Sequence, residues 1–385
     1  MHKLAGKHVA IFSAQYFPHV GGVENYTFHV AREMARAGIA ATVVTLGDSK
    51  GISREEASDG FTVLRLPARR LLHGRYPIAR PFDLPRRILA NDPVNYVVVN
   101  TRFYPHSLSA VAFAQDRGII PVVIEHGSAH LTLGNAVFDC GVAAIEHFMT
   151  ALVKRHPAQY YGVSKRSSEW LSHFGIASSG ELYNSIDADA FAQSASSRDY
   201  RSELGVAPSV PLVAFVGRLA PEKGVQQLLA AASTLPEVHF VLAGDGPLRS
   251  QLEAEAGRNV SFVGSVSSAD VASLLSQADL FCLPSRSEGF ATSLLEAAAC
   301  ATPAVITDVG GARELIGDKG LGFVIDGMDD CLVKQAIVTA LADREELEAM
   351  GVRVRNRVKD MFSWKKTAER VLEACERANA HSTTS

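Results

Sequence analysis

Long apolar stretches are the first feature that this chain lacks. No apolar run in its 385 residues approaches the roughly 18 residues that are needed to span a bilayer. The first residues also lack a long apolar core followed by a small-residue cleavage site, which predicts that there is no signal peptide. No GxGxxG motif occurs, which disfavours a nicotinamide or flavin enzyme.

Cysteine is scarce as well. The chain has five cysteines, an odd number, with wide spacings and no CxxC pair. This pattern favours reduced thiols in a cytoplasmic protein and predicts no zinc site. The five are Cys140, Cys282, Cys300, Cys331 and Cys375.

Charge is moderate but uneven. Charged residues make up 21% of the chain, and the net charge is −3. Residues 1–186 carry 19 Lys and Arg against 14 Asp and Glu, so this part is basic and the remainder is acidic. Such an asymmetry suggests a separate partner for the basic half. Nothing in it points to nucleic acid.

Short β-rich runs alternate with helical patterns, and the alternation occurs twice. It breaks near residues 187–200 and then restarts, which predicts two doubly wound α/β domains with parallel sheets, facing across a cleft. The expected strands are Val9–Ser13, Ala41–Leu46, Tyr96–Asn100, Pro121–Glu125, Leu212–Val216, His239–Ala243, Ser261–Val263, Leu280–Leu283 and Ala304–Thr307. The expected helices include Glu24–Ala37, Val225–Ser233, Ala269–Gln277 and Thr292–Ala299.

Ligands of such sheets bind beyond the carboxyl ends of the strands. Gly21-Gly22-Val23-Glu24 follows the first expected strand and opens a helix, whose free amides favour an anion. The alternative is a plain turn. Gly217-Arg218 ends a later strand, and Lys223 follows five residues on. The two cations suit a diphosphate, although they could also be solvated surface residues.

The block Glu288-Gly-Phe-Ala-Thr-Ser-Leu-Leu-Glu296 follows the expected strand Leu280–Leu283. Glu288 lies in the loop and Glu296 about one turn into the next helix. Carboxylates accept paired hydrogen bonds from sugar hydroxyls. The amides near Thr292–Leu295 lie at the N-terminus of the expected helix, where they favour the binding of phosphate oxygens. The alternative is that Glu296 only caps a surface helix.

Taken together, these motifs resemble the family 4 retaining glycosyltransferases of the GT-B fold. The resemblance covers nearly the whole chain and includes, in order, GGVE (21–24), EHG (125–127), GVSK (162–165), YNSID (183–187), FVGRLAPEKG (215–224), LAGDGP (242–247), FVGSV (262–266) and the Glu-x7-Glu block (288–296). It implies an acceptor-side domain at 1–187, a donor domain at 188–362, and a last helix at 363–378 that packs back on the first domain.

The resemblance also implies roles for single residues. Arg218 and Lys223 would hold the donor diphosphate, Glu296 the ribose hydroxyls and Glu288 the hydroxyls of the transferred sugar. Further implied contacts are the backbone of Gly22 to phosphate, the backbone of Val266 to the base, amides at Leu294 and Leu295 to phosphate, His126 to the sugar and its leaving oxygen, and a structural turn at Gly244. The alternative for His126 is a purely structural histidine.

Two positions depart from the family pattern. The family's Asn-Gly-x-Asp reads Asn184-Ser185-Ile186-Asp187 here, and Ser185 would be strained if that turn required a positive φ. Asp187-Ala188-Asp189 imitates a DxD metal motif, but it lies at the expected connection between domains, so we interpret it as coincidental. No metal ion and no cofactor are expected.

The expected activity is metal-independent, retaining transfer of a hexose-type sugar from a UDP-sugar or GDP-mannose. The acceptor would be a glycan or a lipid-linked molecule, in cell-envelope polysaccharide or glycolipid synthesis. Arg102, in the loop 100–106, is a candidate contact for an acceptor phosphate. The alternatives are a sugar nucleotide epimerase of the same fold and a catalytically inactive sugar nucleotide binding module.

The segment Arg65–Arg87 holds seven arginines interleaved with apolar residues, and Asp83 is its only acid. Four prolines make one long helix unfavourable, so a loop with short helical pieces is expected. Basic and apolar residues together suit an anionic bilayer, which suggests peripheral attachment to the inner face of the membrane. A solvated surface loop is the alternative. The arginines are Arg65, Arg69, Arg70, Arg75, Arg80, Arg86 and Arg87.

Overall fold

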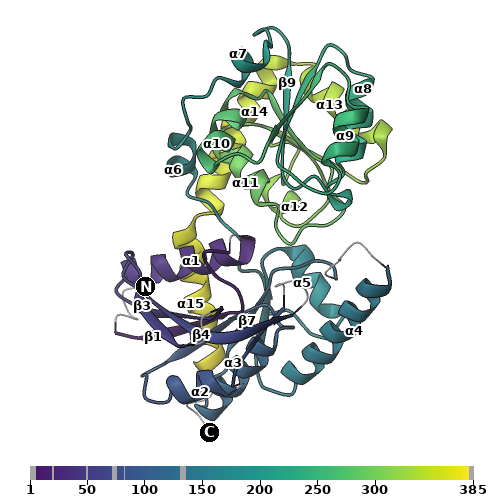
Figure 1. Ribbon diagram of the computed structural model, residues 1–385. Helices are drawn as coiled ribbons and strands as arrows, with labels where there is room; N and C mark the ends of the chain where they lie inside the picture. Colours follow the sequence, from purple (N-terminus) through teal and green to yellow (C-terminus); the bar gives the residue numbers. More distant parts are fainter. Residues whose placement is uncertain are drawn as a thin grey trace. The chain divides into compact units, whose positions relative to one another are not determined.

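The computed structural model describes residues 6–19, 21–48, 51–71, 76–81, 83–130 and 136–380 (Figure 1). Of residues 70–71 and 136–138 it describes the backbone. The chain divides into two compact units. Unit 1 consists of Met1–Asn184 with Trp364–Ser385, and unit 2 of Ser185–Ser363.

Unit 1 is built on a largely parallel sheet in the order β3-β4-β2-β1-β6-β7-β8, with β5 paired antiparallel to β4. Every residue of the central strand β1 is buried, because helices cover both faces of the sheet. Only β3 and β5 run antiparallel to their partner β4. The strands are β1 (His8–Ser13), β2 (Ala40–Gly47), β3 (Ser53–Glu56), β4 (Thr62–Leu71), β5 (Tyr76–Ala79), β6 (Tyr96–Asn100), β7 (Val122–Glu125) and β8 (Gln159–Gly162).

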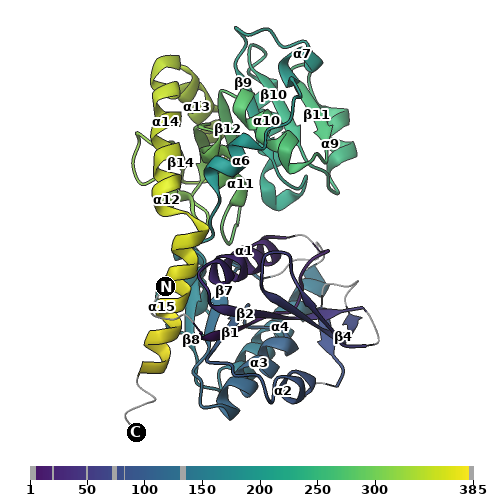
Figure 2. The same ribbon diagram turned by 90° about the vertical axis from the view of Figure 1, so that its left-hand side faces the viewer.

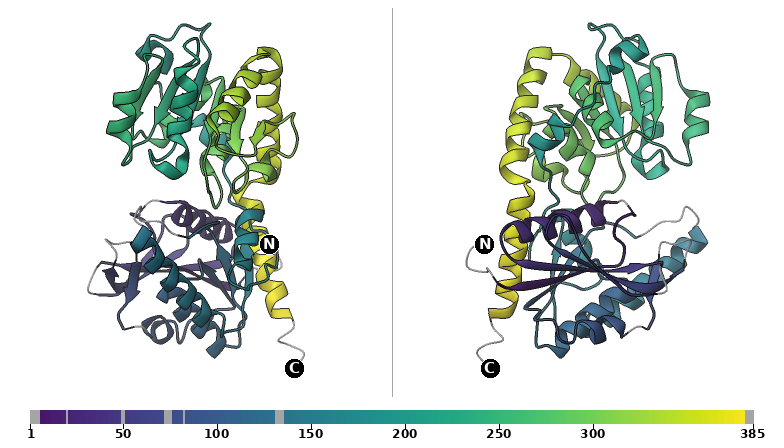
Figure 3. Two further views of the ribbon diagram at one scale, coloured as in Figure 1. Left: turned by 90° about the vertical axis from the view of Figure 1, so that its right-hand side faces the viewer. Right: turned by 60° about the vertical axis from the view of Figure 1, so that its left-hand side comes forward.

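The helices of unit 1 lie on both faces of this sheet. Figure 2 shows α1 on one face and α3 on the other, and Figure 3 gives two further views of the ribbon. Helix α15 runs beside α1 in Figure 2, and the ring of Trp364 at its start stacks on His29 of α1 at a centroid distance of 4.5 Å. The helices are α1 (Gly22–Arg36), α2 (Leu84–Ile88), α3 (Pro105–Asp116), α4 (Ala136–Val153), α5 (Lys165–Ser172) and α15 (Trp364–Ala380).

Unit 2 contains a second parallel sheet, in the order β11-β10-β9-β12-β13-β14. Its strands are β9 (Leu212–Val216), β10 (His239–Ala243), β11 (Val260–Gly264), β12 (Leu280–Leu283), β13 (Ala304–Thr307) and β14 (Phe323–Ile325). Helices α8 and α13 pack together, as do α10 and α11, and α11 and α14 (Figure 1). The helices are α6 (Ala188–Gln193), α7 (Tyr200–Leu204), the 3-10 turn η2 (Pro221–Lys223), α8 (Val225–Ser233), α9 (Arg249–Glu255), α10 (Ser268–Gln277), α11 (Thr292–Ala299), α12 (Ala312–Leu315), α13 (Asp330–Leu341) and α14 (Arg344–Met361).

The segment from Arg65 to Arg87 is not the loop that the prolines suggested. Its described residues form most of β4, all of β5 and, as the one short helical piece, α2. The apolar Val63, Leu64 and Leu66 are buried, and β4 pairs in parallel with β2 as far as Pro67. From Ala68 the same strand pairs with β5 instead. The proline therefore stands where the strand changes partner, a position that does not require its missing N–H in the ladder.

Each sheet has one point at which the order of its parallel strands reverses. In each unit, the strands that run in parallel follow the Rossmann order 3-2-1-4-5-6 along the sheet. The order reverses between β1 and β6 in unit 1 and between β9 and β12 in unit 2. Loops that leave these strand pairs diverge at the carboxyl edge, and this divergence is where ligands bind in such sheets. Within the described residues, no helix is long and apolar enough to cross a membrane.

Candidate active site

The loops after β9 and β12 are held in backbone contact. Gly224, at the end of the β9 loop, has a φ of +67°, and an added Cβ would lie 1.9 Å from the carbonyl oxygen of Pro284. Only glycine allows this approach without a shift of the β12 loop. Close to this contact, the ammonium of Lys223 donates to Glu288 at 2.6 Å, and the hydroxyl of Ser285 donates to the same carboxylate at 2.7 Å.

The other predicted cation, Arg218, lies on the same loop. Its guanidinium is half-exposed and forms an ion pair with Glu222, whose backbone carbonyl accepts a hydrogen bond from the amide of Arg286 at 2.8 Å. The structure thus brings Arg218, Lys223 and Glu288 together on two loops at the reversal point of the unit 2 sheet. Each cation has a carboxylate partner, so an incoming diphosphate would compete with acids already in place.

Helix α11 begins beyond the same loop. Ala291 precedes it and has no side-chain group that could cap the first turn. The amide of Leu294 donates to the carbonyl of Ala291 at 3.0 Å, so the donors without an intrahelical partner are those of the two preceding residues. The side chains of Leu294 and Leu295 are buried. A ligand could therefore meet Leu294 and Leu295 only through their backbone, whereas Thr292 is exposed and Ser293 partly exposed at the start of the helix. This arrangement agrees in kind with an anion at a helix N-terminus.

Glu296 lies in the second turn of α11. Its side chain is partly exposed, and desolvation by its surroundings raises its pKa to about 7. Because a charged carboxylate is disfavoured there, a ligand that donates hydrogen bonds to Glu296 would stabilise the charge. Val266 follows β11 in the loop to α10 and is partly exposed, and Gly244 follows β10.

In unit 1, Gly22 is the first residue of α1, at the carboxyl side of β1. Gly21 precedes this helix and offers no side-chain cap. Among the described residues, and apart from its chain neighbours and its own helix backbone, no atom lies within 4 Å of a Cβ added on Gly22, in contrast to Gly224. Packing within the protein therefore does not require glycine at position 22, which leaves close approach by a ligand as a reason for it.

His126 follows β7 and is held by a directional hydrogen-bond chain. Thr27 donates to the carbonyl of Val23 at 2.7 Å, and Asn100 donates through its amide to the hydroxyl of Thr27 at 2.7 Å. The carbonyl oxygen of Asn100 then accepts from Nε2 of His126 at 2.9 Å. This assigns the proton to Nε2 and a lone pair to Nδ1. Burial lowers the pKa of His126 to about 3, so the imidazole is neutral at physiological pH.

Arg102 does not occupy the position that the sequence suggested. Its side chain is fully buried and forms ion pairs with the buried carboxylates of Glu125 and Glu146, and its guanidinium lies 3.7 Å from the ring centroid of Phe174. An acceptor phosphate cannot reach it. The expectation was wrong because two buried acids require a buried cation, and nothing in the local sequence reveals their proximity.

The linker residues have structural partners. Asp187 caps α6 by accepting from the amide of Ala190, and Asp189 forms ion pairs with Arg355 and Lys359 at 3.3 and 2.8 Å. Among the residues outside the gaps in the description, positive φ values at non-glycine positions occur at Thr101 and Ala301, so Ser185 is not strained in this way. Thr101 follows β6 directly, beside Asn100, and sequence reasoning did not single it out.

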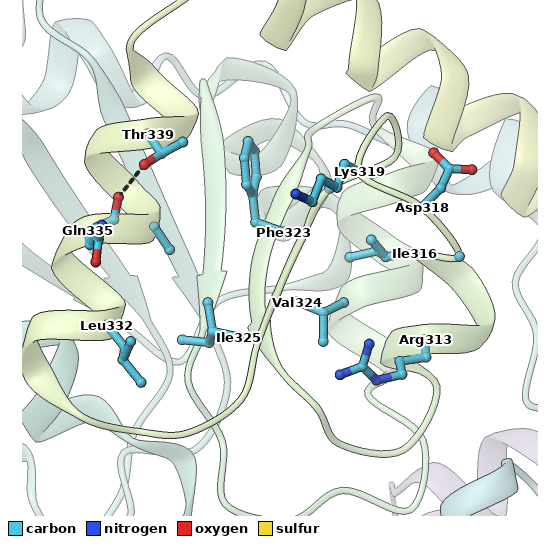
Figure 4. A pocket seen from close by; sticks show the side chains of 13 residues that line it. Arg313, Ile316, Asp318, Lys319, Phe323, Val324, Ile325, Leu332, Gln335 and Thr339 are labelled. Atoms are coloured by element: carbon cyan, nitrogen blue, oxygen red, sulfur yellow. Dashed lines mark hydrogen bonds between the residues drawn. The ribbon is translucent and has the colours of Figure 1, made fainter.

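A cavity of about 540 Å³ lies elsewhere in unit 2. Figure 4 shows it between α13, which contributes Leu332 and Gln335, and the side of α12, which contributes Arg313, with the edge strand β14 along it. None of the predicted donor residues lines it. We place the candidate site at the strand reversal instead, because that is where cations, carboxylates and helix N-termini converge.

Comparison with known proteins shows likenesses to glycosyltransferases. Residues 196–357 match the family "Glycosyl transferases group 1", and residues 21–208 match the "Glycosyl transferase 4-like domain". The alpha-maltose-1-phosphate synthase of Mycolicibacterium smegmatis is 33% identical over 197 residues, 46% of this chain and about half, 51%, of that protein. The D-inositol 3-phosphate glycosyltransferase of Mycolicibacterium paratuberculosis is 27% identical over 94% of this chain and 87% of its own.

Solved structures share the fold. The Anabaena protein Alr3699/HepE in complex with UDP superposes with a TM-score of 0.73 at 20% identity, over 96% of this chain and all of that one. The predicted GT-B fold of two Rossmann-like domains is confirmed by this likeness and by the parallel sheets of both units. The two domain matches overlap at residues 196–208, and with the full-length likeness to a D-inositol 3-phosphate glycosyltransferase they support a glycosyltransferase that is similar to the family 4 type.

Proposed function

We propose that the protein transfers a hexose-type sugar, with retention of configuration, from a nucleotide diphosphate sugar to a glycan or lipid-linked acceptor. The observation that carries this proposal is the Lys223–Glu288 pair with Arg218 at the reversal point of the unit 2 sheet. A structural neighbour that holds UDP supports a UDP-sugar ahead of GDP-mannose as the donor. We place the reaction in the cytoplasm, in cell-envelope polysaccharide or glycolipid synthesis.

The proposed mechanism relies on fixed positive charge. The bond between the anomeric carbon and the diphosphate breaks while the acceptor oxygen attacks from the same face, and a phosphate oxygen takes the acceptor proton. Arg218, Lys223 and the N-terminus of α11 would stabilise the charge that develops on the leaving diphosphate, so we infer that the reaction needs no metal ion. Glu288 is already bonded to Lys223 and Ser285, which suits a ligand for sugar hydroxyls better than a nucleophile.

The roles of the unit 1 residues follow from their protonation. Neutral His126, with its proton on Nε2, can accept a hydrogen bond from a sugar hydroxyl through Nδ1 but cannot supply a proton at pH 7. We therefore assign it a contact to the transferred sugar rather than acid catalysis. Gly22 would meet a phosphate through its backbone amide.

The function can be tested by screening nucleotide sugars. A bound donor raises the melting temperature by mass action, and the donors that stabilise are then incubated with extracts of cell-envelope lipids and glycans. Formation of a glycosylated product supports transfer. Conversion of the donor alone into an isomeric nucleotide sugar supports the epimerase, and stabilisation without any turnover supports an inactive binding module.

A first prediction concerns Gly22. We expect Gly22→Ala to lower transfer at least about tenfold, or about 1.4 kcal/mol, because the methyl group would occupy the space of a phosphate. The free energy of unfolding should stay the same or rise by up to about 1 kcal/mol, since the added Cβ meets open space in the part of the chain that the structure describes. Gly141→Ala, another helical glycine with open space, is the matched control and should leave transfer unchanged. Full activity in Gly22→Ala would contradict the proposed contact between Gly22 and a phosphate.

A second prediction concerns pH and Glu296. Ribose hydroxyls that donate to this carboxyl need its ionised form, and its pKa in the free protein is raised to about 7. Donor affinity should therefore rise as pH increases from about 5.5 to 7 and level off above that, with a proton released on binding. Titration calorimetry in two buffers of different ionisation enthalpy counts this proton.

The Glu296→Gln variant is the control for this pH dependence. Its donor affinity should be lower than that of the wild type at pH 8, and it should not vary with pH. The wild-type carboxyl is harder to ionise when folded, so its stability contribution is present at low pH and lost as pH rises through 7. Glu296→Gln should accordingly be the more stable protein above pH 7. Equal pH dependence in the two proteins would contradict the assignment.

A third prediction concerns the membrane. We propose that unit 1 attaches to anionic bilayers through the arginines of Arg65–Arg87 by charge, without help from Tyr76, Ala79 or Leu84. Leu84 and Ala79 are buried, and the hydroxyl of Tyr76 donates to the carbonyl of Phe103, so these apolar groups are not available for insertion. Leu72, Arg75 and Phe82 lie outside the described residues. Exposed guanidinium groups remain, at Arg69, Arg80, Arg86 and Arg87.

Vesicle co-sedimentation measures this attachment. Wild-type protein should bind anionic vesicles at low salt and dissociate as salt rises, with about 1 kcal/mol for each cation near the surface. Binding should fall when Arg69, Arg70, Arg86 and Arg87 are all changed to Gln. The control changes four exposed arginines of unit 2, Arg258, Arg313, Arg344 and Arg353, and should bind like the wild type. If the wild-type protein does not bind anionic vesicles at low salt, membrane attachment is contradicted and a soluble acceptor is the better interpretation.

A further inference from the structure

Three histidines that are far apart in the sequence converge in unit 1. His130 lies beyond β7, His147 is on α4 and His173 follows α5. One atom from each, able to bind a metal ion, lies within 4.8 Å of the other two. The three ring centroids form a nearly equilateral triangle with sides of 5.1 to 5.4 Å. No spacing in the sequence signals this cluster, because the three residues come from three separate elements.

The distance between His147 and His173 matches a shared ion. Their Nε2 atoms are 3.3 Å apart. Two imidazole nitrogens that each lie about 2.0 Å from one tetrahedral ion are separated by about 3.3 Å. The two rings therefore need little movement to bind the same ion. Both side chains are exposed, so an ion can reach them from solvent.

His130 is oriented as a metal-binding histidine usually is. Its Nδ1–H donates to the carboxylate of Glu146 at 2.7 Å, which leaves the lone pair of Nε2 for an ion. Glu146 is buried and fixed by its ion pair with Arg102. A carboxylate behind a ligating histidine sets its tautomer and raises its basicity. The buried Glu125–Arg102–Glu146 network thus supplies the support that such a site needs.

Aromatic side chains hold the other two imidazoles in place. Trp170 stacks on His173 with a centroid distance of 4.6 Å and an angle of 6° between the rings, and Phe174 lies 4.7 Å from His147. Preset rings lower the entropic cost of binding.

We propose that His130, His147 and His173 bind one divalent late transition metal ion of the Zn²⁺ class, with the fourth coordination position open to solvent. Imidazole ligands favour Zn²⁺, Ni²⁺ and Co²⁺ over Mg²⁺ or Ca²⁺. The ion would cross-link α4, the end of α5 and the segment after β7. Because that segment begins with His126, occupancy of the metal site would restrict the part of the chain that carries the sugar-contacting histidine.

Binding can be measured on protein that carries no polyhistidine tag and has been stripped with EDTA. Competition of Zn²⁺ with a chromogenic chelator should show one ion per chain, and Co²⁺ should give the intense visible bands of a four-coordinate site. Zn²⁺ should also raise the melting temperature. Mg²⁺ in excess should neither displace Co²⁺ nor stabilise the protein.

Variants of the exposed ligands locate the ion. His147→Asn and His173→Asn should each weaken Zn²⁺ binding by roughly a hundredfold, the upper end of the affinity losses seen when residues that support a metal site are changed. Both variants should also lose the Co²⁺ bands. His156→Asn changes a partly exposed histidine of unit 1 outside the cluster and should bind like the wild type. No stoichiometric binding to wild-type protein, or unchanged binding in both ligand variants, would overturn the proposal.

The same stripped protein separates this site from the transfer reaction. If the proposed mechanism holds, sugar transfer persists in EDTA although the histidine site is empty. Loss of transfer in EDTA that Zn²⁺ restores to the wild type but not to His147→Asn would confirm the metal site and contradict the metal-independent mechanism. The two proposals can therefore fail separately.

Discussion

Removing either cation of the donor loops is expected to cut sugar transfer by roughly a hundredfold or more, the scale of losing one preorganised electrostatic contact. Arg218→Ala and Lys223→Ala should lower kcat more than they raise KM, because charge on the leaving diphosphate is greatest in the transition state. Lys223→Ala also leaves Glu288 without the ammonium that lies 2.6 Å from it, so a carboxylate would face the incoming phosphates. Glu288→Ala should reduce transfer to a similar extent.

The chain offers a matched control for Arg218. Arg344 pairs with Glu348 four residues on, as Arg218 pairs with Glu222, but on the exposed surface of α14. Exposed pairs of this kind contribute little to stability, so Arg344→Ala should keep both transfer and folding. Steady-state kinetics with the donor identified by the thermal screen provide the measurement. Wild-type kinetics in the Arg218, Lys223 and Glu288 variants would contradict the assignment of the donor site.

The second large effect is expected on stability, at Arg102. Arg102→Met should lower the free energy of unfolding of unit 1 by about 3–5 kcal/mol, because it leaves the buried carboxylates of Glu125 and Glu146 without a cation. Burial lowers the pKa of Arg102 to about 10, so the wild-type side chain is charged at neutral pH. The chain has two tryptophans, Trp170 and Trp364, and both lie in unit 1, so their fluorescence during urea denaturation reports on this unit.

Neutralising the acids should reverse most of the loss. Arg102→Met combined with Glu125→Gln and Glu146→Gln buries no unpaired charge and should recover most of the wild-type stability. Arg36→Met, which removes an exposed partner of Glu33 on α1, should change stability by less than about 1 kcal/mol. If Arg102→Met were as stable as Arg36→Met, the buried network would not support this part of unit 1.

Local sequence patterns were sufficient to predict the strands of both sheets. Every strand that was expected from an apolar run is present within one or two residues, and Tyr96–Asn100, Leu212–Val216 and Leu280–Leu283 match their strands fully. Buried parallel strands are continuous apolar runs, so they can be recognised one at a time. The glycines and charges that follow them could be recognised as loops for the same reason. The segment after Arg65 was the exception: its prolines suggested a loop, whereas the buried Val63, Leu64 and Leu66 around its start belong to β4.

The two-domain α/β class and the candidate donor set of Arg218, Lys223, Glu288 and Glu296 could be predicted from local sequence patterns and the family resemblance. Which of these groups meet, the burial of Arg102 and the convergence of three histidines became visible in the folded chain. Patterns within a strand or a loop depend on neighbours in the chain, whereas these contacts join separate elements, such as the Lys223 and Glu288 loops or the three elements that carry the histidines. The partner of a buried acid or of a clustered histidine cannot be predicted from a periodic sequence pattern, because the packing of helices against the sheet decides which side chains meet.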